Sequence, residues 1–307
     1  MVLQTLRFGV CVPTLNAGPS WLEWLNRAEP ALAGAHRRLV IDSSSSDATA
    51  CLAAERGWEV ETIARDSFDH GGTRQRALEL LADCDVVVFL TQDALVADEN
   101  ALTALNEAFK APHVGAVFGR QLPHDDATPI AAHARLFNYP EESRVVSEAD
   151  IPTLGLKTAF LSNSFAAYRR EALLAAGGFP TGTILSEDMI AGARLLQNGW
   201  QLAYCAKACV HHSHNYSLGQ EFKRYFDIGV LHHREGWLLA WLGKAEGEGG
   251  RFVRSEIRYL LRHAPWRLPE AGLRTCLKYL GYRLGKAENR LPVSLKRRLS
   301  MHRRFWG

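Results

Sequence analysis

The chain has 307 residues, of which 47% are hydrophobic and 22% are charged. A chain of this length and composition buries a real core, and it is sized for one large domain or for one domain with an appendage. These values exclude a globally disordered protein. The longest apolar runs, such as residues 85–90, have the length of a strand, well short of the ~18–20 apolar residues of a membrane span.

The N-terminal residues run directly into a strand pattern, without the basic start, apolar stretch and cleavage site of a secretion signal. We therefore expect a cytoplasmic protein. The six cysteines are scattered, several of them inside apolar runs, which predicts buried reduced thiols and no disulfides. Cys205, Cys209 and His211 superficially suggest zinc, but a second ligand pair at a finger-like distance is missing, so structural zinc is disfavoured.

Short apolar runs alternate with segments of helical spacing in the first hundred residues. We predict strands at residues 6–13, 38–42, 58–63 and 84–90, and helices at residues 21–32, around 53–55 and at 73–82. This alternation indicates an α/β fold with a mostly parallel sheet flanked by helices. Such sheets bind ligands at the carboxyl ends of their strands, and polar loops follow three of these four strands.

The second half of the chain continues with further elements. A strand at residues 114–118 leads into an irregular segment through Pro123 and Pro140, which we interpret as a long active-site loop. Strands are then predicted at residues 160–168 and 200–210, and helices at 170–176 and 187–198 with Ser186 as the N-cap. The Gly- and Glu-rich residues 246–250 predict a boundary between a catalytic domain, 1–246, and a helical extension, 247–307.

The formal net charge of +3 hides an uneven distribution. Residues 251–307 contain 15 Lys and Arg against 3 Asp and Glu, a net charge of +12, which leaves −9 for residues 1–250. Arginines recur at helical spacing beside apolar residues, at positions 251, 254, 258 and 262. This pattern favours a basic amphipathic tail on an anionic membrane surface. A solvated basic helix face is the first alternative, and nucleic-acid binding is the least favoured one.

Four polar elements are candidates for chemistry. Asp42 ends a strand before a serine-rich loop, where it is placed to hold a ribose or base, with helix capping as the alternative for Asp42 and Asp47. Asp93 follows an apolar strand and could bind a divalent cation that bridges a diphosphate. A second acid is absent beside it, so a further ligand is required, for which a histidine after the last strand is the candidate.

The other two elements are an acidic pair and a histidine group. Glu187 and Asp188 begin a helix, where the helix dipole alone would favour them. The functional alternative is that one carboxylate accepts a proton from an attacking hydroxyl while the other tunes its basicity. His212 and His214 belong to the group that follows the last strand, and hydrogen bonding within a loop is the alternative to metal binding for both.

Taken in order, six segments resemble glycosyltransferase family 2, the inverting nucleotide-sugar enzymes with a GT-A fold, and especially its bacterial rhamnosyltransferase branch. These segments are residues 12–16, 41–49, 68–75, 91–93, 186–188 and 212–216. The resemblance covers residues 6–235. Its most specific parts, residues 68–75 and residues 212–216 continuing through 220–229, point to users of dTDP-rhamnose.

The resemblance implies roles for individual residues. The implied donor-nucleotide residues are Pro13, Thr14, Asn16, Asp42, Ser44, His70, Gly71, Arg74, Gln92 and Asp93. Asn163, Ser164 and Glu187 are implied to line the sugar or acceptor pocket, and Asp188 matches the catalytic base. Asp93 and His212 would hold Mg²⁺ or Mn²⁺. Thr91 stands where the first acid of the family's Asp-x-Asp motif would be, and His214 is the alternative to His212.

The implied reaction is inverting transfer of L-rhamnose from dTDP-L-rhamnose to a hydroxyl of a cell-surface glycan acceptor, commonly lipid-linked. The basic tail would then keep the enzyme at the inner face of the cytoplasmic membrane. A nucleotidyltransferase or sugar-nucleotide pyrophosphorylase is one alternative. Such an enzyme would require a Gly-rich loop bearing Lys or Arg after the first strand, where residues 16–19 read Asn-Ala-Gly-Pro. A non-catalytic binding module for glycan assembly is another. The acceptor, the linkage and the oligomeric state stay open.

Overall fold

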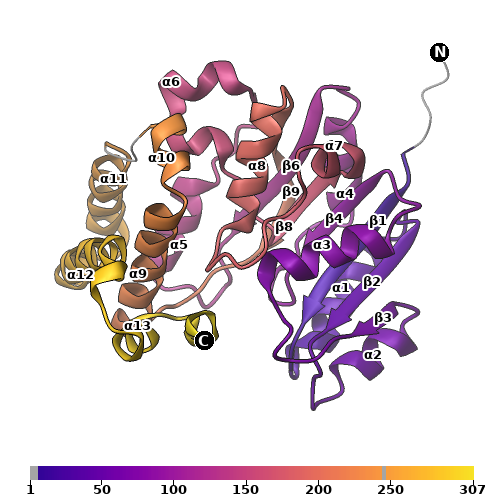
Figure 1. Cartoon of the computed structure of the whole chain (residues 1–307), viewed down its shortest axis with the longest axis horizontal. Helices are drawn as coiled ribbons and strands as arrows, with labels where there is room; N and C mark the ends of the chain where they lie inside the picture. Colours follow the sequence, from indigo (N-terminus) through magenta and orange to yellow (C-terminus); the bar gives the residue numbers. More distant parts are fainter. Residues whose placement is uncertain (1–5, 244–246) are drawn as a thin grey trace.

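The computed structural model describes residues 6–243 and 247–307 of the chain. Its strands are β1 (Phe8–Thr14), β2 (Arg37–Asp42), β3 (Glu59–Thr62), β4 (Val86–Leu90), β5 (Leu95–Val96), β6 (Val114–Leu122), β7 (Arg144–Val146), β8 (Phe165–Arg169) and β9 (Gln201–His211). They form one sheet in the order β3-β2-β1-β4-β8-β6-β9-β5, with β7 paired to β9 (Figure 1).

Helices flank this sheet, and a helical layer follows it in the chain. The helices that precede β9 are α1 (Ser20–Ala31), α2 (Thr49–Glu55), α3 (His70–Leu80), α4 (Ala101–Ala108), α5 (Pro129–Asn138), α6 (Ile151–Leu154), α7 (Arg170–Ala175) and α8 (Glu187–Gln197). Those after β9 are α9 (Leu218–Arg234), α10 (Gly236–Leu242), α11 (Glu248–His263), α12 (Leu268–Lys286) and α13 (Val293–Leu299).

The predicted α/β fold is confirmed, and the four strands at one end of the sheet are all parallel. Strands β3, β2, β1 and β4 pair in parallel. Strand β8 is antiparallel to both β4 and β6, whereas β6 and β9 are parallel. The carboxyl ends of β1, β2 and β4 therefore meet at one edge, which brings together the loops after Thr14, Asp42 and Leu90.

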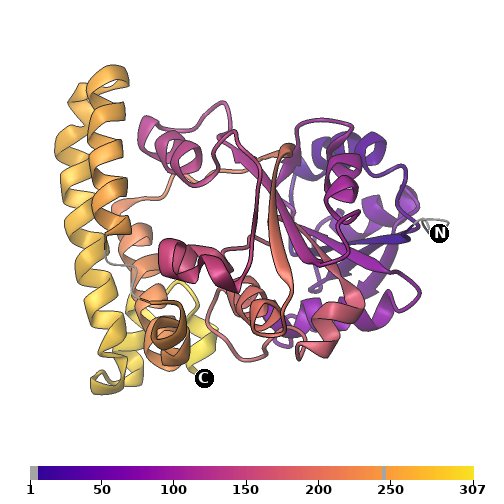
Figure 2. The ribbon, with the colours of Figure 1, turned by 90° about the horizontal axis from the view of Figure 1, so that it is seen from above.

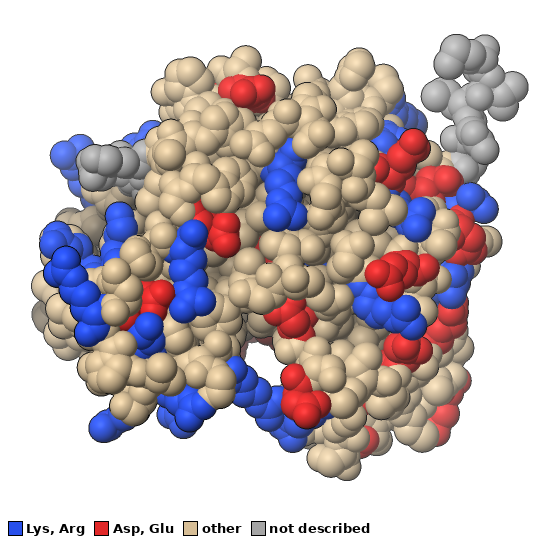
Figure 3. All heavy atoms as spheres, in the orientation of Figure 1, with Lys and Arg blue, Asp and Glu red and all other residues tan. Residues whose placement is uncertain are grey.

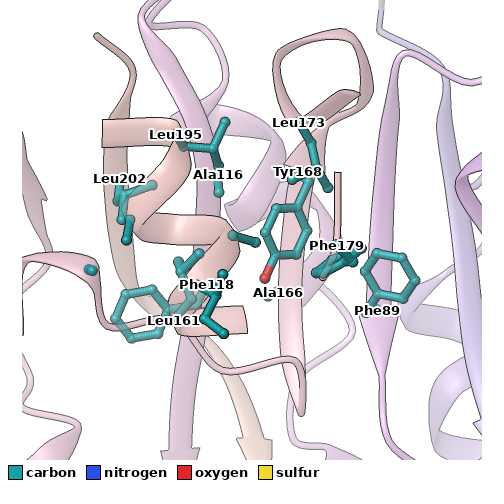
Figure 4. Packing of buried hydrophobic residues seen from close by; sticks show 14 of the residues in the cluster. Phe89, Ala116, Phe118, Leu161, Ala166, Tyr168, Leu173, Phe179, Leu195 and Leu202 are labelled. Atoms are coloured by element: carbon teal, nitrogen blue, oxygen red, sulfur yellow. The ribbon is translucent and has the colours of Figure 1, made fainter. Parts of the chain in front are cut away.

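Each face of the sheet has its own buried cluster, because side chains alternate along a strand. On β1, Val10 and Val12 pack on one face while Cys11 packs on the other. Tyr168 of β8 packs against Phe89 and Phe179, with ring centroids 5.9 and 5.1 Å away (Figure 4). This aromatic group ties β4 to β8 beneath the sheet edge where the polar loops meet.

Two predicted elements differ in the structure. The segment interpreted as a long irregular loop contains α5, which begins at Thr128, whose hydroxyl accepts from the Ala131 N–H, followed by Pro129 in the first turn. A Thr-Pro pair is a helix-start signal, so this helix was predictable. The predicted strand at residues 160–168 begins only at Phe165. Because residues 160–164 lie outside the sheet, the Asn163 N–H is available to a side chain.

The prediction of Ser186 as the N-cap residue of α8 is confirmed. Ser186 occupies the N-cap position but adopts φ 60°, and its side chain caps no backbone N–H. The left-handed backbone turns the chain so that Glu187 enters a buried position at the start of the helix. All six cysteines are free, as predicted, although Cys51 and Cys276 are exposed rather than buried.

The residues after α10 form a helical layer on α9 and α5. Helix α12 crosses α9 so closely that a Cβ atom on Gly285 would lie 2.0 Å from the Phe226 carbonyl oxygen, which only glycine permits. Helices α11 and α12 lie side by side on the outside of this layer (Figure 2). The predicted extension 247–307 is thus helical, while its boundary at residue 246 lies outside the described residues. None of the described helices has the length and hydropathy that a membrane crossing requires.

Candidate active site

An acid and two histidines meet at the sheet edge. Asp93 follows β4, whereas His212 and His214 follow β9, and one ligand atom of each lies within 4.8 Å of the others. The Nε2 atoms of His212 and His214 lie 3.5 and 3.9 Å from Asp93 Oδ2. Sequence reasoning treated the two histidines as alternatives, and the structure brings both to Asp93.

Gln121, at the end of β6, orients the first of these histidines. Its Oε1 atom lies 3.0 Å from His212 Nδ1, so this nitrogen donates, and Nε2 is the ring atom that faces Asp93. The same oxygen accepts from Arg135 Nη1 of α5 at 2.5 Å. This arrangement fixes the imidazole as metal-binding proteins fix their histidine ligands.

The charges of the cluster suit a cation. Burial, and then the neighbouring His212, lower the pKa of His214 to about 4, so that this imidazole is neutral at pH 7. Burial opposes ionisation of Asp93, but His212, Thr91 and His214 together hold the pKa of this carboxyl below its ordinary value. One carboxylate and two imidazoles form a donor set that fits a divalent cation.

Asp188 lies at the start of α8, in contact with the loop before β8. The Asn163 N–H donates to its Oδ2 at 3.1 Å, and the Met189 N–H donates to its Oδ1 at 2.8 Å. Burial and the negative charge of Glu187 raise the pKa of Asp188 to about 7, against these two hydrogen bonds. A carboxylate with a pKa near neutrality is suited to act as a general base.

Glu187 has a different environment from its neighbour. It is 5% exposed and pairs with Arg74 of α3 at 3.0 Å, while Asn163 Nδ2 donates to the same oxygen at 3.0 Å. The pKa of Glu187 is lowered because the charges of Arg74 and His70 outweigh its burial. Two adjacent carboxyls thus have opposite pKa shifts, which assigns the charge to Glu187 and the proton-accepting role to Asp188.

Hydrogen bonds, together with the peptide link between Ser162 and Asn163, connect the acid–histidine cluster to Asp188. Gln121 contacts His212 through its oxygen and donates from Nε2 to Ser162 Oγ at 2.8 Å. The next residue, Asn163, donates from its backbone to Asp188. The two predicted functional groups therefore belong to one continuous network rather than to separate surfaces.

The predicted nucleoside residues gather at the ends of β1 and β2. Thr14 Oγ1 and Ser45 Oγ donate to Asp42 Oδ1 at 2.9 and 2.6 Å, so this buried acid holds the serine loop against β1. The Asn16 N–H donates to Ser45 Oγ at 2.8 Å. The capping role suggested for Asp47 is present locally, since its carboxylate accepts from the Thr49 N–H at 3.1 Å.

Left-handed backbone marks three of these loops. Among the residues that the structure describes, Asn16, Ser44 and Ser186 are the non-glycine residues with positive φ, at 46°, 57° and 60°. Each lies within one of the segments that carry the family resemblance. Such conformations are costly for residues with a Cβ atom, and they cluster at functional sites.

Several predicted donor residues contact protein in this structure. Gln92 pairs with the backbone of Leu15, accepting from its N–H at 2.8 Å and donating to its oxygen at 3.2 Å. A Cβ atom on Gly71 would lie 1.6 Å from the Pro180 carbonyl oxygen, so this glycine allows α3 to meet the turn before α8. Pro13 lies within β1, and Ser164 is half-buried next to Asn163.

Sequence reasoning missed Gln121, Arg135 and Tyr168 as parts of the site. Tyr168 donates from its hydroxyl to Asn163 Oδ1 at 2.7 Å. A usable signal existed for Gln121, because it is a polar residue near the end of an apolar strand, β6, just as Asp93 is a polar residue shortly after β4. Arg135 lies on α5, the helix that was interpreted as a loop, so its contact with Gln121 was missed together with that helix.

The fold and the site define a class. A sheet of this order, with an acid–histidine cluster and a buried acid pair at one edge, is that of a GT-A glycosyltransferase. The mannosyltransferase PcManGT from Pyrobaculum calidifontis, solved with GDP-Man and Mn²⁺, aligns with a TM-score of 0.55 at 19% identity, covering 99% of this chain and 86% of that one. TarS residues 1–349 from S. aureus, solved with UDP-GlcNAc, align with a TM-score of 0.53 at 15% identity, covering 93% and 92%.

Sequence comparison identifies the family. The family model described as glycosyltransferase like family 2 matches residues 7–226, so this chain belongs to that family and is a glycosyltransferase. The O-antigen chain rhamnosyltransferase WbaN of Salmonella anatum is 49% identical over 301 residues, 98% of this chain and 96% of the relative. RfbN of Salmonella typhimurium, of the same description, is 47% identical over 303 residues, again 98% and 96%.

The two acids predict a specific pH dependence. Because a base must be ionised to accept a proton, kcat/KM should rise with pH and level off above the pKa of Asp188, about 7. Glu187→Gln removes the neighbouring negative charge, which should lower the pKa of Asp188 and shift the rise of kcat/KM to lower pH. Profiles of kcat/KM against pH for both proteins test this, with Glu107→Gln on the exposed face of α4 as the control. If kcat/KM of Glu187→Gln rises over the same pH range as that of the wild-type protein, the predicted effect of Glu187 on Asp188 is contradicted.

Proposed function

We propose that this protein transfers L-rhamnose from dTDP-L-rhamnose to a hydroxyl of a lipid-linked O-antigen glycan, with inversion at the anomeric carbon. The observation that carries the proposal is the network joining Asp93, His212 and Asp188. The relatives named as O-antigen chain rhamnosyltransferases support the sugar and the acceptor class, since they match 98% of this chain.

In this proposal Asp188 accepts the proton of the acceptor hydroxyl. The deprotonated oxygen attacks the anomeric carbon from the face opposite the diphosphate, and dTDP departs. Asn163 positions the base, because its N–H fixes one carboxylate oxygen of Asp188. The ionised Glu187, paired with Arg74, keeps the pKa of that base near neutrality.

Asp93, His212 and His214 would hold the divalent cation of the site. A bound cation of this kind neutralises the charge that develops on a departing diphosphate. Both Mg²⁺ and Mn²⁺ accept carboxylate oxygens, but two imidazole nitrogens favour Mn²⁺ over the harder Mg²⁺. We therefore propose Mn²⁺ as the better-fitting ion.

The direct test is an assay with labelled dTDP-L-rhamnose and lipid-linked O-antigen intermediates, with and without EDTA. We expect labelled glycan and free dTDP in equal amounts, and loss of both products when EDTA is present. Absence of dTDP release with every acceptor would favour the binding module instead. A requirement for pyrophosphate or a sugar phosphate would favour a nucleotidyltransferase.

The basic helical layer supports a location at the cytoplasmic face of an anionic membrane. On α11, Arg254, Arg258 and Arg262 are exposed together with Ile257 and Leu261, all at steps of three and four. Exposed apolar side chains continue on the following turn and α12, where Trp266, Leu273, Tyr279 and Leu280 are 72%, 49%, 63% and 50% exposed. Lys and Arg gather on this side of the molecule (Figure 3). Cations beside exposed aliphatic and aromatic groups suit a lipid interface.

Removing three of these cations should weaken membrane binding strongly. Near an anionic surface each cation contributes about 1 kcal/mol, so combined Arg254→Ala, Arg258→Ala and Arg262→Ala should lower partitioning onto phosphatidylglycerol vesicles about 100-fold. Vesicle sedimentation at several salt concentrations measures this. The matched control removes three exposed cations of the sheet side, Arg27, Arg76 and Lys110. Equal binding by the α11 variant and the wild-type protein would contradict the proposal.

A further inference from the structure

The segment 220–229, one of the most family-specific parts of the sequence, has no role in the transfer chemistry derived above. It lies on α9, where Phe226 and Asp227 are fully buried. A Cβ atom on Gly229 would lie 2.3 Å from the Tyr282 carbonyl oxygen, so Gly229 serves the crossing with α12. Phe226 and Asp227 contact the end of the chain, residues 300–307, which we name the C-terminal strap.

Helix α9 holds the strap at two points. The Met301 N–H donates to Asp227 Oδ2 at 2.9 Å. Trp306 packs on Phe226 with ring centroids 6.3 Å apart, and the Arg234 guanidinium lies 5.1 Å from its ring. The buried Asp227 carboxylate therefore holds one end of the strap on α9, and the contact of Trp306 with Phe226 holds the other end.

Between these anchors the strap reaches the start of α3. The ring of His302 lies edge-on to the ring of His70, with centroids 5.4 Å apart and an interplanar angle of 85°. The Phe68 ring also lies edge-on to the His70 ring, with centroids 5.0 Å apart. Arg304 Nη1 donates to the Arg65 carbonyl oxygen at 2.9 Å, which ties the strap to the loop after β3. Figure 1 shows the chain end returning from α13 toward the sheet.

Side-chain contacts link this ring pair to the acids at the start of α8. Arg74 Nη1 donates to the His70 carbonyl oxygen at 2.9 Å and lies 3.0 Å from Glu187 Oε1. A Cβ atom on Gly71, the residue after His70, would lie 3.5 Å from Glu187 Cβ. The start of α3 is therefore packed against Glu187, the neighbour of Asp188. Figure 3 shows that this face is hollowed between the sheet side and the helical layer.

We propose that the C-terminal strap forms one wall of the donor site and that His302 is a positioning residue, which holds the His70 imidazole toward a bound nucleoside diphosphate. Residues 70 and 302, which are far apart in the sequence, would thereby complete one pocket. The proposal rests on the proposed function only in that the site accepts a nucleoside diphosphate, whichever sugar the nucleotide carries.

The test compares three variants in the full-length protein. His302→Ala should raise the Kd for dTDP with MnCl₂, and the KM for dTDP-L-rhamnose, about tenfold with little change in kcat. The reason is that the His70 imidazole loses the ring that holds it in place. His302→Phe keeps a ring against His70 and should restore most of the affinity. His233→Ala, an exposed histidine of α9, is the control. Calorimetry with dTDP, UDP and GDP and steady-state kinetics supply the readouts, with Tm measured alongside.

The outcomes separate the two proposals. Lowered nucleotide affinity in His302→Ala with recovery in His302→Phe supports the strap, even if dTDP-L-rhamnose proves not to be the donor. A lowered Tm with unchanged Kd and KM would reduce the strap to a structural anchor and overturn the proposal. Failure of the wild-type protein to bind any of the three nucleotides would overturn both the strap and the proposed function.

Discussion

Asp188→Asn is expected to lower kcat by about 10²–10⁴-fold, the usual contribution of a general base, while the Kd for dTDP changes little. The asparagine side chain keeps the volume of Asp188 and retains an oxygen for the Asn163 N–H, but it cannot accept the proton of an acceptor hydroxyl. Single-turnover transfer of labelled sugar gives the rate of the chemical step, and calorimetry gives donor affinity.

A matched control separates this effect from a loss of charge. Asp66→Asn changes an exposed acid in the loop after β3, and it should leave the rate unchanged. Residual turnover of Asp188→Asn within tenfold of the wild-type protein would assign the base to another group. Loss of dTDP binding in Asp188→Asn would instead indicate damage to the fold around Asn163.

Asp93→Ala and His212→Ala should each weaken Mn²⁺ binding about 100-fold or more, and transfer at limiting Mn²⁺ should fall in proportion. Each substitution removes one ligand atom of a three-residue set. Gln121→Leu should have a smaller effect of the same sign, because it removes only the acceptor that orients His212. Electron paramagnetic resonance titration of free Mn²⁺ measures the affinity directly.

The control for the metal prediction is a histidine elsewhere on the surface. His263→Ala removes an exposed imidazole at the end of α11 and should leave Mn²⁺ affinity unchanged. Wild-type affinity in Asp93→Ala, together with transfer that EDTA does not inhibit, would show that the cluster is not a metal site.

Much of the fold was predictable because local signals agreed with the tertiary structure. The strands at the N-terminal half have apolar runs of strand length, and β4 is buried at every position, as expected for a strand covered on both faces. The α5 region was mispredicted because Pro123 and Pro140 are loop signals on both sides of it. The Thr128–Pro129 pair that starts the helix lies between them. The late start of β8 has a signal in the sequence, since residues 160–164 read Phe-Leu-Ser-Asn-Ser, and three consecutive polar residues break the alternation of a strand.

The site was predictable to the extent that strand ends determine it. Asp42 ends β2 and Asp93 follows β4, and parallel pairing brings the ends of these two strands to one edge. The ion pair between Arg74 and Glu187 was not predictable, because it joins residues 113 positions apart on two helices. The contact of His302 with His70 was equally beyond sequence reasoning, which assigned the whole basic C-terminal region to the membrane.

The most direct test of the central claim is a crystal structure of Asp188→Asn with MnCl₂ and dTDP-L-rhamnose, with anomalous scattering used to locate the ion. We predict an anomalous peak within bonding distance of Asp93, His212 and His214, with residue 188 facing the anomeric carbon on the side away from the diphosphate. An ion bound elsewhere, or a nucleotide sugar lying outside the edge formed by β1, β2 and β4, would contradict this account of the site.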